Sequence, residues 1–147
     1  MRNIETTDLQ KSVVFSKQQI RIIVAGTRNF TDVEYMRLHL GLIIKEYQKK
    51  YPGKEIVIVS GGATGADWLG EKYAEYYGYK YYRFPAKWKE YGRAAGHMRN
   101  QEMLDFACQE IPVVVAFWDG MSVGTKNMIS IARAANVSVH VEYYRYK

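Results

Sequence analysis

The sequence predicts one α/β domain built on a parallel sheet of about five strands with helices on both faces. Short apolar, β-branched runs alternate with stretches of helical periodicity, glycine-rich segments follow three of the runs, and 147 residues suit one domain. Strands separated by helices form right-handed crossovers, which produce a parallel sheet. We predict the strand order 3-2-1-4-5.

The first half of the chain predicts three strands and two helices. Residues 20–25 are almost all apolar, as in a strand covered on both faces, and residues 56–59 repeat this pattern. Between them, residues 32–50 have apolar side chains at helical spacing and end before Pro52-Gly53. Residues 65–77 predict a second helix, and the amphipathic residues 79–84 predict an edge strand.

The second half continues the alternation after a loop rich in aromatic and basic residues. We predict helices at residues 98–108 and 125–135, and strands at 113–118 and 137–141. Cys108 is expected to pack in the core, and the tyrosine-rich C-terminus to pack on the sheet or on a neighbouring subunit. Residues 1–18 are predicted to form a polar N-terminal extension, and residues 19–147 the domain.

Composition restricts the partners and the compartment. A net charge of +6 and a pI near 9.3 indicate an anionic partner, and the scattered basic residues favour a small molecule over nucleic acid. The longest apolar runs fall far short of the roughly 20 residues that span a bilayer, so no membrane segment is expected. One cysteine permits no internal disulfide, and no secretory signal is recognisable, so we expect a cytoplasmic protein.

Ligands of such sheets bind beyond the carboxyl ends of the strands, where the strand order reverses. The loop after the first strand places Gly26, Thr27, Arg28, Asn29 and Phe30 there. Glycine allows close backbone approach, threonine offers a hydroxyl group, and arginine grips a phosphate or carboxylate with two hydrogen bonds. An ordinary turn with a surface arginine is the alternative interpretation.

The second loop predicts a phosphate cradle at a helix N-terminus, where backbone amides and the helix dipole favour an anion. Its candidate ligand-binding residues are Ser60, Gly61, Gly62, Ala63, Gly65 and Asp67. Ala66-Asp67 stands where an ATP-binding P-loop has Lys-Ser or Lys-Thr, so ATP hydrolysis of that type is not expected. Asp67 is expected either to cap the helix or to accept hydrogen bonds from a ribose.

The third loop contains Gly120-Met121-Ser122-Val123-Gly124, which matches the Gly-x-Ser-x-Gly elbow of serine hydrolases. No acidic residue lies between Ser122 and His140, so a catalytic triad is not expected. We interpret the loop as a second anion or ribose cradle. Its candidate residues are Trp118, Asp119, Gly120, Ser122, Gly124, Thr125 and Lys126.

A fourth segment adds positive charge and aromatic rings. Its candidate ligand-binding residues are Arg93, His97, Arg99 and Asn100, and Trp88 or Tyr91 is suited to stacking on a base. A solvated basic lid is the alternative interpretation. His39, His97 and His140 lie far apart in the sequence, without the spacing of a zinc site, so we expect no metal and no cofactor.

The four segments together resemble the SLOG superfamily, a Rossmann-like group that includes the LOG enzymes and the DprA proteins, and within it the YspA-type subfamily. The matching segments are Gly26 to Arg28, Ser60 to Asp67, Gly92 to Asn100 and Trp118 to Thr125. The resemblance implies binding of nucleotides or their derivatives, including cyclic ADP-ribose isomers and cyclic nucleotides in phage-host conflict, and a homo-oligomer.

Three functions remain open at this stage. The first is a sensor or sequestering protein for a phosphorylated nucleotide-derived signal. The second is a LOG-like N-glycosidase, although Met128 stands where the LOG enzymes have a catalytic glutamate, so that Asp67, Asp119 or Glu102 would have to supply the carboxylate. The third is a DprA-like single-stranded DNA binder that stacks bases on Tyr143, Tyr144 and Tyr146.

Overall fold

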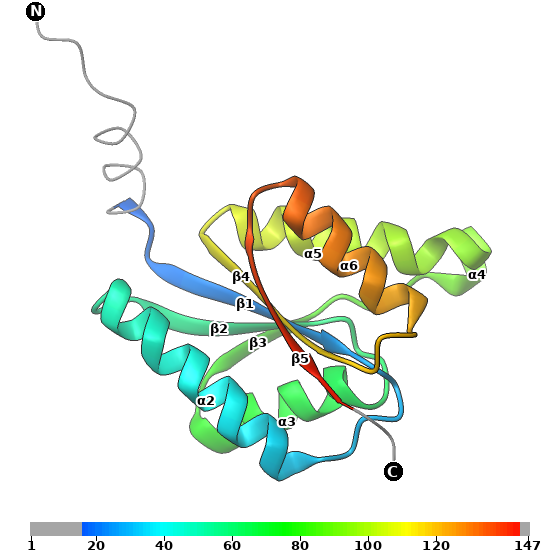
Figure 1. Ribbon diagram of the computed structural model, residues 1–147. Coiled ribbons are helices and arrows are strands. Elements are labelled where there is room, and N and C mark those ends of the chain that lie inside the picture. Colours follow the sequence, from blue (N-terminus) through cyan, green and yellow to red (C-terminus); the bar gives the residue numbers. More distant parts are fainter. Residues whose placement is uncertain (1–15, 145–147) are drawn as a thin grey trace, which may run out of the picture.

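The protein is a three-layer α/β sandwich around a five-stranded parallel sheet (Figure 1). The computed structural model describes residues 16–144, and its strand order is β3-β2-β1-β4-β5, as predicted. The strands are β1 (Gln19–Gly26), β2 (Glu55–Ser60), β3 (Lys80–Arg83), β4 (Ile111–Trp118) and β5 (Ser138–Tyr143). The helices are α2 (Val33–Lys50), α3 (Ala66–Tyr77), α4 (Trp88–Tyr91), α5 (Ala95–Cys108) and α6 (Val123–Ala134), with a 3-10 turn at Gly92–Ala94.

The three inner strands β1, β2 and β4 are buried along most of their length, which explains their nearly continuous apolar sequences. Successive side chains of β1 point to opposite faces of the sheet. Ile20, Ile22 and Val24 pack in one core cluster with α2 and α3, whereas Ile23 and Ala25 pack in a second cluster with α5 and α6. Each face of the sheet is therefore covered by one pair of helices (Figure 1).

The strand order reverses at β1, which pairs with β2 on one side and β4 on the other. The loops after these three strands leave the same edge of the sheet. This is the edge where a ligand crevice is expected in an open α/β sheet.

Two sequence-based predictions were wrong in detail. The segment after β3 is not a loop up to residue 97, because it contains α4, the 3-10 turn and the first turn of α5, where Gly96 lies against the ring of Trp88. Cys108 is exposed instead of packed in the core. It lies four residues after the buried Leu104, on nearly the same side of α5, so its place as the last residue of the helix accounts for its exposure.

The C-terminal tyrosines have different environments. Tyr144 packs edge-on against Phe30, with ring centroids 4.8 Å apart, which agrees with the predicted packing on the sheet. Tyr143 is exposed and its ring lies beside Trp118, whereas Tyr146 lies outside the described residues. Residues 1–15 of the predicted extension are also outside this range. No helix between residues 16 and 144 is long and apolar enough to cross a membrane.

Candidate functional site

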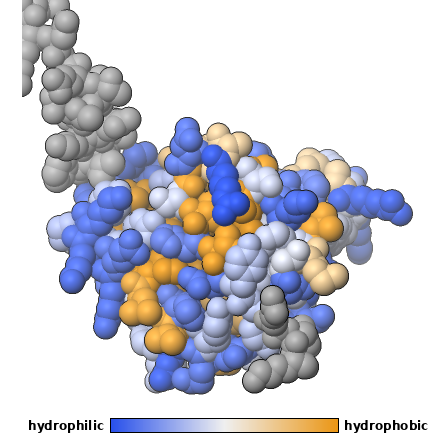
Figure 2. Space-filling model, in the orientation of Figure 1, coloured by the Kyte–Doolittle hydropathy of each residue, from blue (hydrophilic) through white to orange (hydrophobic). Residues whose placement is uncertain are grey.

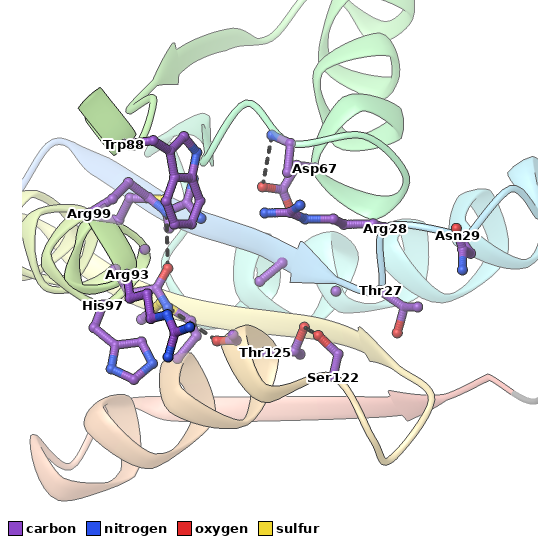
Figure 3. A pocket seen from close by; sticks show the side chains of 18 residues that line it. Thr27, Arg28, Asn29, Asp67, Trp88, Arg93, His97, Arg99, Ser122 and Thr125 are labelled. Carbon is purple, nitrogen blue, oxygen red and sulfur yellow. Dashed lines mark hydrogen bonds between the residues drawn. The ribbon is translucent and has the colours of Figure 1, made fainter. Parts of the chain in front are cut away.

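A pocket of about 390 Å³ opens at the edge of the sheet where β1, β2 and β4 end (Figure 3). Arg28 enters it from the loop after β1, Asp67 from α3, and Arg99 from α5, while Ser122 and Thr125 border it at the start of α6 (Figure 3). Residues of all four predicted segments thus line one cavity. They are Ala25, Gly26, Thr27, Arg28, Asn29, Ala63, Asp67, Trp88, Arg93, Gly96, His97, Arg99, Asn100, Met103, Ser122, Gly124, Thr125 and Met128.

The loops after β1 and β4 are tied together by hydrogen bonds. The amide of Asp119 donates to Oγ1 of Thr27 at 3.1 Å, and the amide of Thr27 donates to the carbonyl oxygen of Phe117. Oδ1 of Asp119 accepts from the amides of Met121 and Ser122 at 2.8 and 2.9 Å. These hydrogen bonds from backbone amides hold the pKa of Asp119 below its usual value. The loop is therefore shaped by its own carboxylate, and Asp119 does not line the pocket.

The loop after β2 is held by a polar network centred on the buried side chain of Glu71. Oγ of Ser60 donates to the Glu71 carboxylate at 2.7 Å and accepts from the amide of Gly62 at 3.0 Å. Arg83 closes the network with an ion pair to Glu71, a side chain that is only 2% exposed. Burial acts to raise the pKa of Glu71, but the hydrogen bonds from Arg83 and Ser60 outweigh it and lower the pKa. Glu71 therefore stays ionised and fixes the glycine loop.

Gly65 is the point where the first two loops meet. Its φ of +79° is unfavourable for other residues, and a Cβ atom at this position would overlap the backbone of Thr27 and Arg28. The amide of the next residue, Ala66, donates to the carbonyl oxygen of Thr27 at 3.3 Å. Glycine here brings the N-terminus of α3 against the loop that carries Arg28.

Asp67 is an acidic group in an otherwise basic pocket. Its side chain is 6% exposed, and its Oδ2 accepts from the amide of Ala63 at 3.3 Å. Burial raises the pKa of Asp67 to about 6, against the lowering effects of Arg99, Arg28 and the Ala63 amide. The helix begins after Gly65, so Asp67 is not the N-cap residue. It instead fixes the preceding loop and presents a carboxyl group that changes charge near pH 6.

Arg99 connects α5 to the second loop. Its Nη1 donates to the carbonyl oxygen of Gly61, and its Nε donates to Oδ1 of Asn100 at 3.1 Å. Burial lowers the pKa of Arg99, while the Asp67 carboxylate acts to raise it. The guanidinium group thus reaches the floor of the pocket with its position set by backbone and side-chain partners.

A second hollow of about 360 Å³ adjoins the first, and the two share Arg28, Ala63, Trp88 and Arg99. It extends over Gly61, Gly62 and Thr64. The guanidinium carbon of Arg28 lies 5.9 Å from the centre of the Trp88 ring, within the range of a cation–π contact. The indole ring and the two arginines therefore stand between two connected cavities.

The contact between α5 and α6 forms a further wall of the main pocket. Nδ2 of Asn100 donates to the carbonyl oxygen of Gly124 at 3.1 Å and to Oδ1 of Asn127 at 2.9 Å. The hydroxyl groups of Ser122 and Thr125 lie 3.1 Å apart. Met128 is fully buried one turn further along α6, where it lines the pocket. A thioether therefore lines the pocket at the position for which the resemblance predicts the LOG glutamate.

Several predicted site residues do not line this pocket. Phe30 is part of the core, Ser60 is buried in the Glu71 network, and the indole of Trp118 donates to the carbonyl oxygen of Ser122. Gly61 and Gly62 line the adjoining hollow. The remaining residues outside the main pocket are Gly65, Asp119, Gly120 and Lys126.

Sequence reasoning missed the lining residues Ala25, Gly96 and Met103, and the supporting pair Glu71 and Arg83. A glutamate on the buried face of a helix was the available signal for that pair, because such a charge requires a partner. Among residues 16–144, no group of three or more His, Cys, Asp and Glu side chains is arranged to hold a metal ion.

The fold and the pocket define a Rossmann-like α/β protein with a basic cleft at the carboxyl edge of its sheet. Residues 20–91 match the model of the YspA, cpYpsA-related SLOG family, and the chain belongs to this family. Membership of this family indicates that the chain binds a nucleotide-related small molecule.

The chain is also similar to a curated phage protein. It is 34% identical over 91 residues to the Gene 61 protein of Mycobacterium phage D29, covering 57% of this chain and 69% of that protein. No solved structure matches the chain.

Proposed function

We propose that the protein binds a phosphorylated, nucleotide-derived small molecule and acts as a sensor or sequestering protein for it. The observation that carries the proposal is the convergence of Arg28, Arg93 and Arg99 on one cavity that lies at the starts of α3 and α6. Arginine fork geometry and helix N-termini both favour phosphate groups. A volume of about 390 Å³ lies within the range of small-molecule sites.

Each wall of the cavity has a distinct role in this proposal. Arg28 and Arg99 bind the phosphate groups, the hydroxyl groups of Ser122 and Thr125 bind the ribose, and Trp88 stacks on the base. The adjoining hollow over Gly61 and Gly62 gives room for a second phosphate group or nucleoside. A cyclic ADP-ribose isomer or a cyclic nucleotide has this combination of groups. Similarity to a phage protein supports a role in phage-host conflict.

The first experiment is mass spectrometry of the protein purified from cells that make nucleotide signals, compared under native and denaturing conditions. We expect a phosphorylated nucleotide derivative that co-purifies and is returned unchanged after incubation with fresh protein. Controlled titration with adenosine monophosphate, ADP-ribose and cyclic nucleotides then ranks the ligand classes. Failure of every phosphorylated nucleotide to bind would contradict the proposal.

Replacement of Arg28 or Arg99 by alanine is expected to weaken ligand binding by about 1.5–3 kcal/mol, or roughly 10- to 150-fold, because a charged hydrogen bond is lost. Isothermal titration calorimetry with the co-purified compound measures this effect. Arg133→Ala is the matched control, because Arg133 is exposed in the last turn of α6, outside the pocket. Unchanged affinity in both pocket variants would reject the site.

A LOG-like N-glycosidase is the second candidate, favoured by one observation. Asp67 is a pocket carboxyl group whose pKa is raised to about 6, which suits a general acid or base. Asp119 and Glu102 do not line the pocket. Release of free base and sugar phosphate from the bound compound, abolished in Asp67→Asn, would establish this activity instead of binding alone. Tight, steeply salt-dependent binding of oligonucleotides would indicate a DNA binder.

A further inference from the structure

Asp67 and Glu71 are the acidic side chains that are buried within residues 16–144. The other acidic groups of this range reach water, and Figure 2 shows hydrophilic side chains over much of one face of the molecule. Glu71 is neutralised by its ion pair with Arg83. Asp67 forms no ion pair within the described range, and its Oδ2 accepts a hydrogen bond from the amide of Ala63. A buried carboxyl group without an ion-pair partner is costly to keep ionised.

The groups around Asp67 are the cations that the proposed function assigns to the ligand. Burial raises the pKa of Asp67, Arg99 and Arg28 act to lower it, and Glu71 acts to raise it. Arg28 approaches from the loop after β1 and Arg99 from α5 (Figure 3). A Cβ atom at Gly61 would overlap both Nη1 of Arg99 and Oδ2 of Asp67, so this glycine allows the guanidinium and carboxyl groups to lie side by side.

The remaining walls of the pocket add positive charge and hydroxyl groups. Arg93 of the 3-10 turn and His97 of α5 line it, and the start of α6 contributes Ser122 and Thr125. Histidine side chains also gain a proton near neutral pH, so His97 has to be considered beside Asp67. Among the described residues that line the pocket, Asp67 is the acidic one. A bound phosphate group therefore meets one like charge, that of Asp67.

We propose that Asp67 binds the phosphate group of the ligand as a neutral acid, and that it takes up one proton from water when the ligand enters. The inference rests on the proposed function, because it requires a phosphate group beside Arg28 and Arg99. Two negative groups that share a partly dehydrated site favour protonation of one of them. Oδ2 keeps the hydrogen bond from Ala63, and Oδ1 carries the proton and donates it in a hydrogen bond to a phosphate oxygen. Asp67 thus acts as a donor to phosphate instead of an acceptor from ribose.

Proton uptake and anion binding are thermodynamically linked, so each favours the other. Below pH 6 the carboxyl group is already largely neutral, since its pKa is about 6, and the anion meets no opposing charge. Above this pH the carboxylate has to gain a proton when the anion binds. The affinity for the anion is then expected to fall by up to about tenfold for each pH unit.

NMR titration of the full chain with sulfate tests the proposal. Sulfate resembles a phosphate group in size and geometry, and it neither gains nor loses a proton near neutral pH. The carboxyl carbon of Asp67 is assigned by its absence in Asp67→Asn. Its titration is expected to move up by at least about one pH unit in sulfate, compared with sodium chloride of equal ionic strength.

Asp67→Asn separates a proton-dependent contact from a merely structural role. An asparagine amide donates a hydrogen bond as the neutral acid does, and it cannot ionise. We expect the wild type to bind sulfate at least about tenfold more weakly at about pH 8 than at about pH 5, whereas Asp67→Asn changes less than about twofold. At the higher pH the variant is expected to bind sulfate more tightly than the wild type.

Asp105→Asn is the matched control, because it removes the same charge from an exposed position of α5 outside the pocket. This variant and His97→Gln are both expected to keep the pH dependence of the wild type. Loss of the pH dependence in His97→Gln instead of Asp67→Asn would assign the proton to the histidine and overturn the proposal.

The signals of Arg28 and Arg99 separate failure of this proposal from failure of the proposed function. If sulfate moves these signals while the pKa of Asp67 stays constant, or if Asp67→Asn weakens binding at the higher pH, the proton-linked role of Asp67 is wrong and the phosphate site stands. If sulfate leaves both arginine signals unchanged at either pH, the phosphate site itself is wrong, and the role of Asp67 fails with it.

Discussion

At the residue scale, Asp67 shows how burial changes the chemistry of a single side chain. The carboxyl group lies between two arginines that favour its ionised form, yet burial outweighs them and raises its pKa to about 6. The carboxyl group therefore changes between its neutral and charged forms near pH 6. In the proposed function, the phosphorylated ligand binds beside this group. An anionic ligand near Asp67 would favour the protonated form further.

Asp67→Asn is expected to make the protein more stable at pH 8 and to leave its stability unchanged near pH 4. The pKa of the folded state, about 6, exceeds the ordinary 3.8, so the contribution of Asp67 is fully present below pH 3.8 and is lost as the pH rises through 6. The difference corresponds to roughly 3 kcal/mol at most. Urea denaturation from pH 4 to 8 measures it.

Asp119→Asn is the control for this experiment, because the pKa of Asp119 is lowered by the amides of Ser122 and Met121. Its contribution is present above the unfolded-state pKa and is lost as the pH falls through the lower folded-state value. We therefore expect this variant to lose stability at neutral pH. Equal pH profiles for the two variants would contradict the assignment of a raised pKa to Asp67.

Glu71→Ala is expected to destabilise the protein by about 1–3 kcal/mol, because it removes the acceptor shared by Ser60 and Arg83 under the second loop. Thermal or urea unfolding measures the loss. Glu75→Ala is the matched control one turn along α3, where the carboxylate forms an exposed pair with Lys72. The wild type is also expected to lose this contribution at acid pH, because the pKa of Glu71 is lowered.

At the scale of elements, the pocket depends on how the starts of α3 and α6 dock against the loop after β1. Gly65 permits the first contact, and the bond from the Asp119 amide to Thr27 makes the second. Each helix start is thereby held beside Arg28. The two contacts convert three separate loops into one cavity.

Gly65→Ala is expected to cost more than about 2 kcal/mol of stability, since the new methyl group meets fixed backbone and φ is positive. Gly124→Ala is the control in α6, where a Cβ atom has open space and alanine favours the helix. We expect the control to be neutral or stabilised by less than about 1 kcal/mol. Chemical denaturation of both variants decides the matter, and similar losses would contradict the tight docking at Gly65.

At the scale of the whole molecule, a ligand that binds only the folded chain couples the pocket to global stability. A nucleotide ligand at 100 times its dissociation constant is expected to add about 2.7 kcal/mol, and to raise the Tm of a domain of this size by roughly 5–10 °C. A thermal shift screen of phosphorylated and unphosphorylated nucleosides measures this. Arg28→Ala should reduce the shift to about half or less at the same ligand concentration, and an unreduced shift in this variant would place binding elsewhere.

The chain by itself determined the architecture and the edge of the sheet that carries the pocket. Apolar period and glycine position are local properties, so the five strands and three of the pocket loops could be predicted from consecutive residues. The strand order was also predicted correctly, but it depends on pairing between distant strands, for which the sequence offered only the general preference for right-handed crossovers. The same reasoning failed to predict α4. Its segment has little apolar periodicity, and in the folded chain the ring of Trp88 lies beside Gly96 of α5. Sequence reasoning also failed at Cys108, which is exposed at the end of α5 although its helical face is apolar.

Tertiary structure alone decided which candidate residues line the pocket and how they are charged. Thr27 and Asp119 are hydrogen-bonded although they are 92 residues apart in the chain. Arg99 likewise donates a hydrogen bond to Gly61, 38 residues away. Phe30 turned into the core and Ser60 into the Glu71 network, although both stand beside residues that line a cavity. The physical reason is that burial, pKa and hydrogen-bond partners depend on neighbours in space, which the order of residues along one strand or helix does not specify.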